Sequence, residues 1–222
     1  VQTANAVVEG CFLGTDATGT LAKGNSHGVK AALGANNSGL RVGGTAPAAR
    51  NLISGNATGI LIESGANVVV QGNLIGTNAA GTAAVGNSFD GINIQASSNV
   101  IGGTTTTARN VISGNGRHGI SLGTDAAVVQ NNLVQGNFIG TDITGTQLLG
   151  NGGDGVFATS ATTNTIGGTI FKAGTPPANL IAGNAGNGVG AAEVDHQDVW
   201  QRTALGVTVV SGDAGRCEAH GA

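Results

Sequence analysis

The pattern that decides the fold is Gly114-Asn115-Gly116-Arg117-His118-Gly119-Ile120, because related versions of it occur six times along the chain. Each copy begins with Gly-Asn and closes, after two or three residues, with Gly and a β-branched residue. Successive closing glycines are 31, 32, 28, 36 and 33 residues apart; they are Gly28, Gly59, Gly91, Gly119, Gly155 and Gly188. A motif that recurs every 20 to 50 residues indicates a stacked repeat, in which one unit is too small to bury its own apolar face.

A longer period, which spans two of these motifs, aligns residues 10–71 with 72–135 and with 136 onward. Each copy opens with Gly-x-[Phe/Leu]-[Leu/Ile]-Gly-Thr-[Asp/Asn]-x-x-Gly-Thr and later contains [Val/Ile]-Gly-Gly-Thr. The apolar runs are three to five residues long and end at Gly, Asn, Thr or Ser, which is typical of short strands joined by turns. Three strands per rung, all wound the same way, predict parallel pairing. We therefore predict an all-β chain whose residues 1–190 form a single-stranded parallel β-helix of about six rungs.

The register of the repeat identifies the core and a polar column. We expect seven aliphatic side chains to be mostly buried: Ile92, Ile94, Val111, Ile120, Leu122, Ile139 and Val156. Asparagine recurs at the start of strands, at Asn51, Asn73, Asn110, Asn137 and Asn179, with Cys11 at the corresponding place in the first rung. Because Asn tolerates a left-handed backbone and its amide can bond the amides above and below, we expect a structural ladder at a bend.

Composition limits the partners that the chain can have. The formal net charge is −3, and the nine Lys and Arg residues are scattered, so we exclude nucleic acid and an anionic membrane as main partners. No apolar run is long enough to span a bilayer. Cys11 and Cys217 lie at opposite ends, so a disulfide framework is not expected. The chain begins at Val1 in mid-pattern, without Met or a signal peptide, so we expect a fragment or a mature piece of something longer.

The repeat pattern stops after Gly190. Residues 191–222 hold seven of the 21 charged residues and the only Trp, Trp200, and they contain no Gly-Asn motif. Two interpretations of this tail stay open. A short helix over residues 193–205 would cover the open end of the solenoid, where strand edges are otherwise exposed. Alternatively, the tail is foreign to the repeat protein and disordered.

The residue before each closing Gly forms the column of greatest chemical interest. It is His27, Thr58, Asp90, His118, Asp154 and Asn187 in successive rungs. The last four should be in register about 5 Å apart, which makes Asp90, His118 and Asp154 candidate catalytic residues in an acid/base or metal cluster. Flanking carboxylates should raise the pKa of His118 above ~6.5. The alternative is that Asp, His and Asn are simply favoured before Gly in turns.

A second candidate site is the Gly-Thr-[Asp/Asn] motif. It offers one carboxylate in two of its three copies, Asp16 and Asp142, with Asn78 between them. Calcium takes six to eight oxygen ligands, and copies two rungs apart are poorly placed to share an ion. We therefore regard Asp16 and Asp142 as weak Ca²⁺ candidates beside a turn capped by its own side chain. No other cofactor is expected.

These motifs resemble those of the right-handed parallel β-helix repeat family, the superfamily that contains pectate lyases and many secreted bacterial surface proteins. The resemblance covers about residues 5–190 and rests on Asn-x-Ile-x-Gly-Asn, Ile-Gly-Gly-Thr and Gly-Thr-Asp-x-Thr-Gly-Thr. It implies the right-handed winding. Uronate lyases of this fold use a Ca²⁺-binding carboxylate cluster with an Arg or Lys base, and galacturonases use clustered Asp residues. No compact match to either arrangement is visible here.

Two functional hypotheses follow. The first is a non-catalytic segment of a large secreted or cell-surface bacterial protein, serving as a stalk, an adhesion element or a binding surface, with the rest of a larger chain as its partner. The alternative is a polysaccharide hydrolase or lyase, or a carbohydrate-binding module, that uses Asp90, His118 and Asp154. A polysaccharide or a cell-surface glycan is then the ligand, and both hypotheses place the protein outside the cell.

Overall fold

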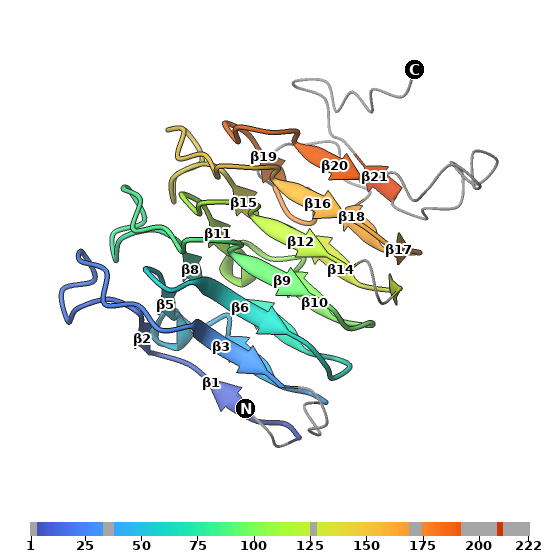
Figure 1. Ribbon diagram of the computed structural model, residues 1–222, viewed down its shortest axis with the longest axis horizontal. Coiled ribbons are helices and arrows are strands. Elements are labelled where there is room, and N and C mark those ends of the chain that lie inside the picture. Colours follow the sequence, from blue (N-terminus) through green and yellow to red (C-terminus); the bar gives the residue numbers. More distant parts are fainter. Residues whose placement is uncertain (1–3, 33–37, 125–127, 169–174, 192–207, 211–222) are drawn as a thin grey trace.

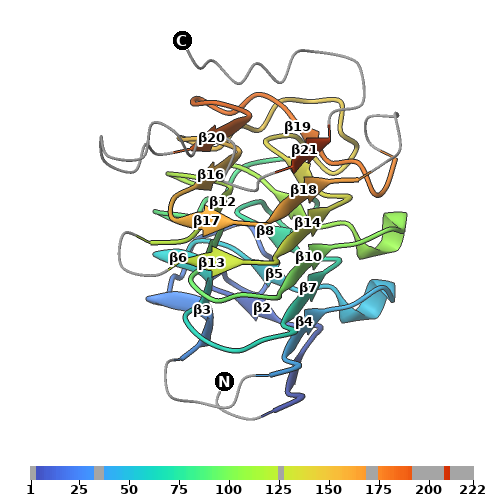
Figure 2. The ribbon, with the colours of Figure 1, turned by 90° about the vertical axis from the view of Figure 1, so that its right-hand side faces the viewer.

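The computed structural model of the protein describes residues 4–32, 38–124, 128–168, 175–191 and 208–210. The chain winds into a parallel β-solenoid whose turns stack along one axis (Figures 1 and 2). Six strands occur in two of its sheets, so five turns separate the first of them from the last, close to the predicted count. The predicted tail helix over residues 193–205 lies outside the described residues.

Three parallel sheets run along the stack. Sheet I contains β1 (Val7–Val8), β4 (Arg41–Gly43), β7 (Val69–Gln71), β10 (Val100–Gly102), β14 (Leu133–Gln135), β18 (Thr165–Gly167) and β21 (Thr208–Val210). Sheet II contains β2 (Phe12–Leu13), β5 (Leu52–Ile53), β8 (Leu74–Ile75), β11 (Val111–Ile112), β15 (Phe138–Ile139) and β19 (Leu180–Ile181). Sheet III contains β3 (His27–Ala31), β6 (Thr58–Ile62), β9 (Ile92–Ile94), β12 (Ile120–Leu122), β16 (Val156–Ala158) and β20 (Val189–Ala191). A further pair joins β13 (Val129–Gln130) and β17 (Ala161–Thr162).

Aliphatic side chains stack in register inside the solenoid. Ile120 pairs with Ile92 on one side and with Val156 on the other, and all three are fully buried. The seven side chains predicted to be buried are all at most 3% exposed. Short parallel strands need this buried aliphatic layer, because each strand gains little stability from its own hydrogen bonds.

Val111 is buried for a different reason from the other six. It belongs to a small second cluster with Leu52, Leu74 and Phe138, whereas its neighbour Ile112 belongs to the main core. Neighbouring residues of a strand point to opposite faces, so this second cluster lies on the outer face of sheet II. The Gly-Thr-[Asp/Asn] loops cover it: Ile143 packs against it, and a side chain at Gly19 would collide with Leu52.

The loops recur in alternate turns and project from one edge of the stack (Figure 1). They touch one another, because Ala79 N–H donates to the Gly19 carbonyl at 3.1 Å and Ile143 N–H donates to the Gly81 carbonyl at 2.9 Å. In the described residues, two of the other turns carry a single turn of 3-10 helix, η1 (Pro47–Ala49) and η2 (Thr106–Ala108), which the sequence pattern does not predict. Pro47 begins η1 with a fixed φ, and Thr105 Oγ1 caps η2 by accepting from Ala108 N–H.

Candidate functional site

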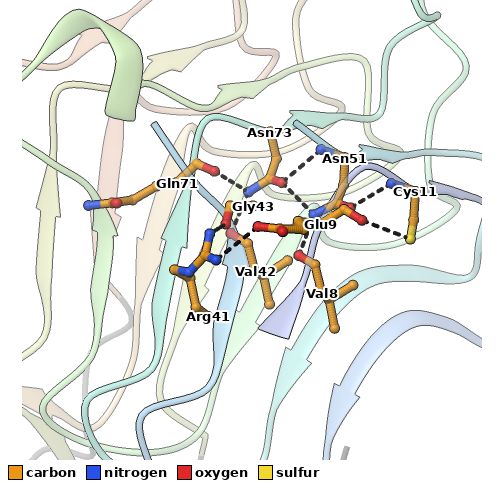
Figure 3. Close-up of polar contacts among 9 residues, drawn as sticks. All are labelled: Val8, Glu9, Cys11, Arg41, Val42, Gly43, Asn51, Gln71 and Asn73. Carbon is orange, nitrogen blue, oxygen red and sulfur yellow. Dashed lines mark hydrogen bonds and ion pairs between the residues drawn. The ribbon is translucent and has the colours of Figure 1, made fainter. Parts of the chain in front are cut away.

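The predicted Asn ladder is present, and it shows how polar groups join the turns. Asn51 Nδ2 donates to Asn73 Oδ1 at 2.9 Å and to the Val8 carbonyl at 2.9 Å (Figure 3). The ladder continues through Asn110 and Asn137 to Asn179. Cys11 takes the first position as predicted, and its N–H donates to Asn51 Oδ1. In each step an oxygen in one turn accepts from an N–H in the turn before it.

Two further ladders were not predicted. The asparagines of the Gly-Asn motif form a series from Asn25 to Asn184, buried from Asn56 to Asn151, with links such as Asn87 Nδ2 to Asn115 Oδ1 at 2.8 Å. Asn99, Asn132 and Asn164 form the third series. The signal for both was the same in-register recurrence that identified the first ladder.

The candidate column lies at the start of sheet III, where each turn bends just before its strand. Asp90 is 2% exposed and Asp154 8% exposed, while the side chain of His118 is 12% exposed. All three lie one above another at the same position of successive turns. His118 N–H donates to Asp90 Oδ1 at 3.2 Å, and Asp154 N–H donates to His118 Nδ1 at 3.0 Å. Asn187 N–H donates in turn to Asp154 Oδ1 at 2.5 Å.

This arrangement joins successive turns as the Asn ladders do, except that the acceptor lies in the earlier turn and the N–H donor in the later one. Each side chain of the column supplies an acceptor for the backbone N–H of the column residue in the next turn. An oxygen or nitrogen acceptor of suitable length at this position satisfies a backbone donor that otherwise has no strand partner. The side chains predicted as catalytic candidates therefore hold successive turns together.

Other side chains complete the surroundings of the column. Asn93 Nδ2 donates to Asp90 Oδ2 at 3.1 Å, and Arg117 Nη1 lies 3.9 Å from the same oxygen. The Phe157 ring stacks on the His118 ring with centroids 4.5 Å apart and planes 10° apart. Neither Asn93 nor Phe157 was predicted to belong to the site. Each stands two residues after a closing Gly, between two inward-pointing strand residues, so strand alternation places it on the outer face of sheet III.

The prediction of a raised His118 pKa is wrong in direction. Burial lowers the pKa of His118, and the positive charge of Arg117 acts in the same sense. The Asp90 and Asp154 carboxylates act in the opposite sense but do not outweigh burial. The cause is the cover provided by side chains such as Phe157 from the next turn, which removes the imidazole from water. His118 is therefore neutral at pH 7 rather than a ready proton donor.

Asp16 and Asp142 are not brought together. Asp16 accepts from Thr18 Oγ1 and from the N–H groups of Thr20 and Leu21, all within its own loop. Asp142 makes the same set of bonds to Thr144, Thr146 and Gln147. Across the part of the chain that the structure describes, no three His, Cys, Asp or Glu side chains lie close enough to hold a metal ion. No helix among these residues is long and apolar enough to cross a bilayer.

Comparisons with known proteins give one partial match. A family model described as "Protein of unknown function (DUF503)" matches residues 184–221. That range covers a small part of the chain. It begins at Asn184 in the last turn, and most of it lies outside the described residues. No curated protein and no solved structure matches the chain significantly.

Proposed function

We propose that the chain is a non-catalytic, rigid β-solenoid segment of a larger secreted or cell-surface bacterial protein. The observation that carries this proposal is the use of Asp90, His118 and Asp154 as acceptors for backbone N–H groups. A general acid or base must reach the proton that it transfers in a bound substrate. Asp90 is instead buried, with one oxygen held by His118 N–H and the other by Asn93.

Rigidity is the property that such a segment supplies. Three Asn ladders, two apolar clusters and the stacked loops join each turn to its neighbours. A solenoid joined in this way holds its two ends at a fixed separation and presents a regular surface. The resemblance of the repeats to those of secreted bacterial β-helix proteins supports the proposed location.

An assay of enzymatic turnover and a measurement of rigidity together test the proposed function. We expect no reducing-sugar release and no unsaturated product from pectin, alginate, xylan or cellulose. Turnover that Asp154→Asn abolishes would refute the non-catalytic proposal. For rigidity, spin labels at exposed Lys23→Cys and Ala185→Cys, with Cys11 and Cys217 replaced by Ser, should give one narrow distance distribution. A broad distribution would refute the spacer role.

A glycan-binding surface is the second candidate. Phe89 is 56% exposed, and Arg117 in the next turn is also exposed. The two residues are adjacent, because the backbone N–H of Arg117 donates to the Phe89 carbonyl. An exposed aromatic ring beside a cationic hydrogen-bond donor suits the apolar face and hydroxyl groups of a sugar. Phe89→Ala should abolish retention by a glycan in affinity electrophoresis, whereas Val128→Ala, at an apolar side chain that is 63% exposed, should not. Retention unaffected by Phe89→Ala would remove this candidate.

A further inference from the structure

The step between the turns that carry β12 and β16 differs from its neighbours in the chemistry of its acceptor. Asp154 N–H donates there to a ring nitrogen, His118 Nδ1, whereas the adjoining steps use carboxylate oxygens of Asp90 and Asp154. To accept this bond, Nδ1 must carry no proton, so the neutral ring holds its proton on Nε2. Imidazole changes protonation near neutral pH, which a carboxylate acceptor does not.

The surroundings of the ring favour the neutral form. The charged groups that face it are Asp90 from the turn before, Arg117 beside it, and Asp154 from the turn after. The His118 side chain is 12% exposed, and Phe157 stacks on it. Burial lowers the pKa of His118, with Arg117 adding to this effect against the two carboxylates.

We propose that His118 is a pH-sensitive junction: proton uptake at Nδ1 breaks the hydrogen bond from Asp154 N–H and loosens the turn carrying β16 from the turn carrying β12. A protonated Nδ1 becomes a donor, and Asp154 Oδ2 lies 3.7 Å from it. Protonation thus changes the ring from an acceptor for the Asp154 backbone N–H into a partner of the Asp154 carboxylate. This proposal does not depend on whether the segment is a spacer or binds a glycan.

The sign of the effect follows from the lowered pKa of His118. As pH falls, the unfolded chain takes up the proton first, near the ordinary histidine value of about 6.5. The stability that neutral His118 contributes is therefore fully present above that pH. It is lost as the pH falls through the lower pKa of the folded state.

Hydrogen exchange of the Asp154 amide, followed by NMR from pH 7.5 to 5 and corrected for intrinsic exchange, tests the proposal. Ordinary carboxyl groups stay ionised in this window. We expect protection in the full chain to fall by about twofold to tenfold, the range for one lost hydrogen bond. His118→Asn should remove this dependence, because an amide oxygen accepts at every pH, as the Asn ladders show.

His27 provides the matched control. It occupies the same column position, but its Nδ1 lies 3.0 Å from Ser26 Oγ in its own turn, and Thr58 N–H donates to the Ser26 carbonyl instead. His27→Asn should therefore leave the pH dependence of Asp154 protection unchanged.

Two results would overturn the proposal: protection of Asp154 that stays flat in the natural chain, or an equal fall in His118→Asn. If His118→Asn does not fold, the ring and amide shifts of the natural chain decide the matter. A shared midpoint below 6.5 for the His118 ring and the Asp154 amide supports the junction. A midpoint of 6.5 or above, or an Asp154 amide that does not follow the ring, overturns it.

Discussion

Aspartate and asparagine exchange places at equivalent positions in this protein. In the three Gly-Thr-[Asp/Asn] loops, one side-chain oxygen of Asp16, Asn78 or Asp142 accepts from two backbone N–H groups. The geometry needs an acceptor of this length, and the amide oxygen of Asn78 serves as well as a carboxylate. The charge at these positions therefore makes stability depend on pH, but it does not determine the loop conformation.

Asp142→Asn tests this equivalence. Burial raises the pKa of Asp142, but hydrogen bonds from Thr144, Gln147 and Thr146 together lower it below its ordinary value. The ionised form thus stabilises the fold above pH ~4, and this contribution is lost as pH falls through the folded pKa. In denaturant unfolding at pH 7 we expect the variant to be nearly as stable as the natural chain, because the amide oxygen can accept the same backbone N–H groups.

Below pH 4 the natural chain should lose stability faster than the Asp142→Asn variant. Asn78→Asp is the matched control, because it should add an acid-dependent loss where the natural chain has none. A difference between Asp142→Asn and the natural chain that stays constant from pH 7 to 2 would contradict this account.

At the same scale, recurrence in register predicted the Asn ladder from Cys11 to Asn179, because the pattern of one residue type per turn is visible in the sequence. The pKa direction of His118 was not predictable in this way. It depends on how far Phe157, from the next turn, removes the ring from water, and on Arg117. Such burial on an outer corner is a property of side-chain packing between turns.

At the scale of single elements, strand alternation explains most of the fold. The strands are two to five residues long, and each directs alternate side chains to the core, so their existence and register followed from short Val- and Ile-rich runs. Alternation also separates Val111 from Ile112, although only the structure shows that loops bury the outer face of sheet II. The 3-10 turns η1 and η2 were missed because a single helical turn leaves no periodic signal.

Ile120→Ala tests the register of β12. Ile120 is fully buried between Ile92 and Val156, so truncation leaves a cavity within the stack. Loss of about 2 to 5 kcal/mol in the free energy of unfolding is expected. Leu148→Ala, at a side chain 72% exposed, should change stability by no more than about 0.5 kcal/mol. Equal effects of the two substitutions in denaturant unfolding would show that the proposed register is wrong.

At the scale of the whole molecule, the solenoid is held by contacts between neighbouring turns. The core is closed in the middle of the stack, where Ile53, Ile75 and Ile112 are fully buried. It is more open in the end turns, where Leu13 and Ile181 are only partly buried. The column through Asp90, His118, Asp154 and Asn187 acts as a fourth ladder, on the outside, in this same set of turn-to-turn contacts.

The most direct test of this central claim is the free energy of unfolding of Asp90→Asn and Asp90→Ala, measured by denaturant titration at pH 7. If Asp90 holds the next turn, Asn should preserve stability to within about 1 kcal/mol, because its Oδ1 can still accept from His118 N–H. Ala should cost about 1 to 3 kcal/mol, because it leaves that donor without its acceptor. An Ala variant as stable as the natural chain, or more stable, would contradict the claim and mark Asp90 as a carboxylate retained for function.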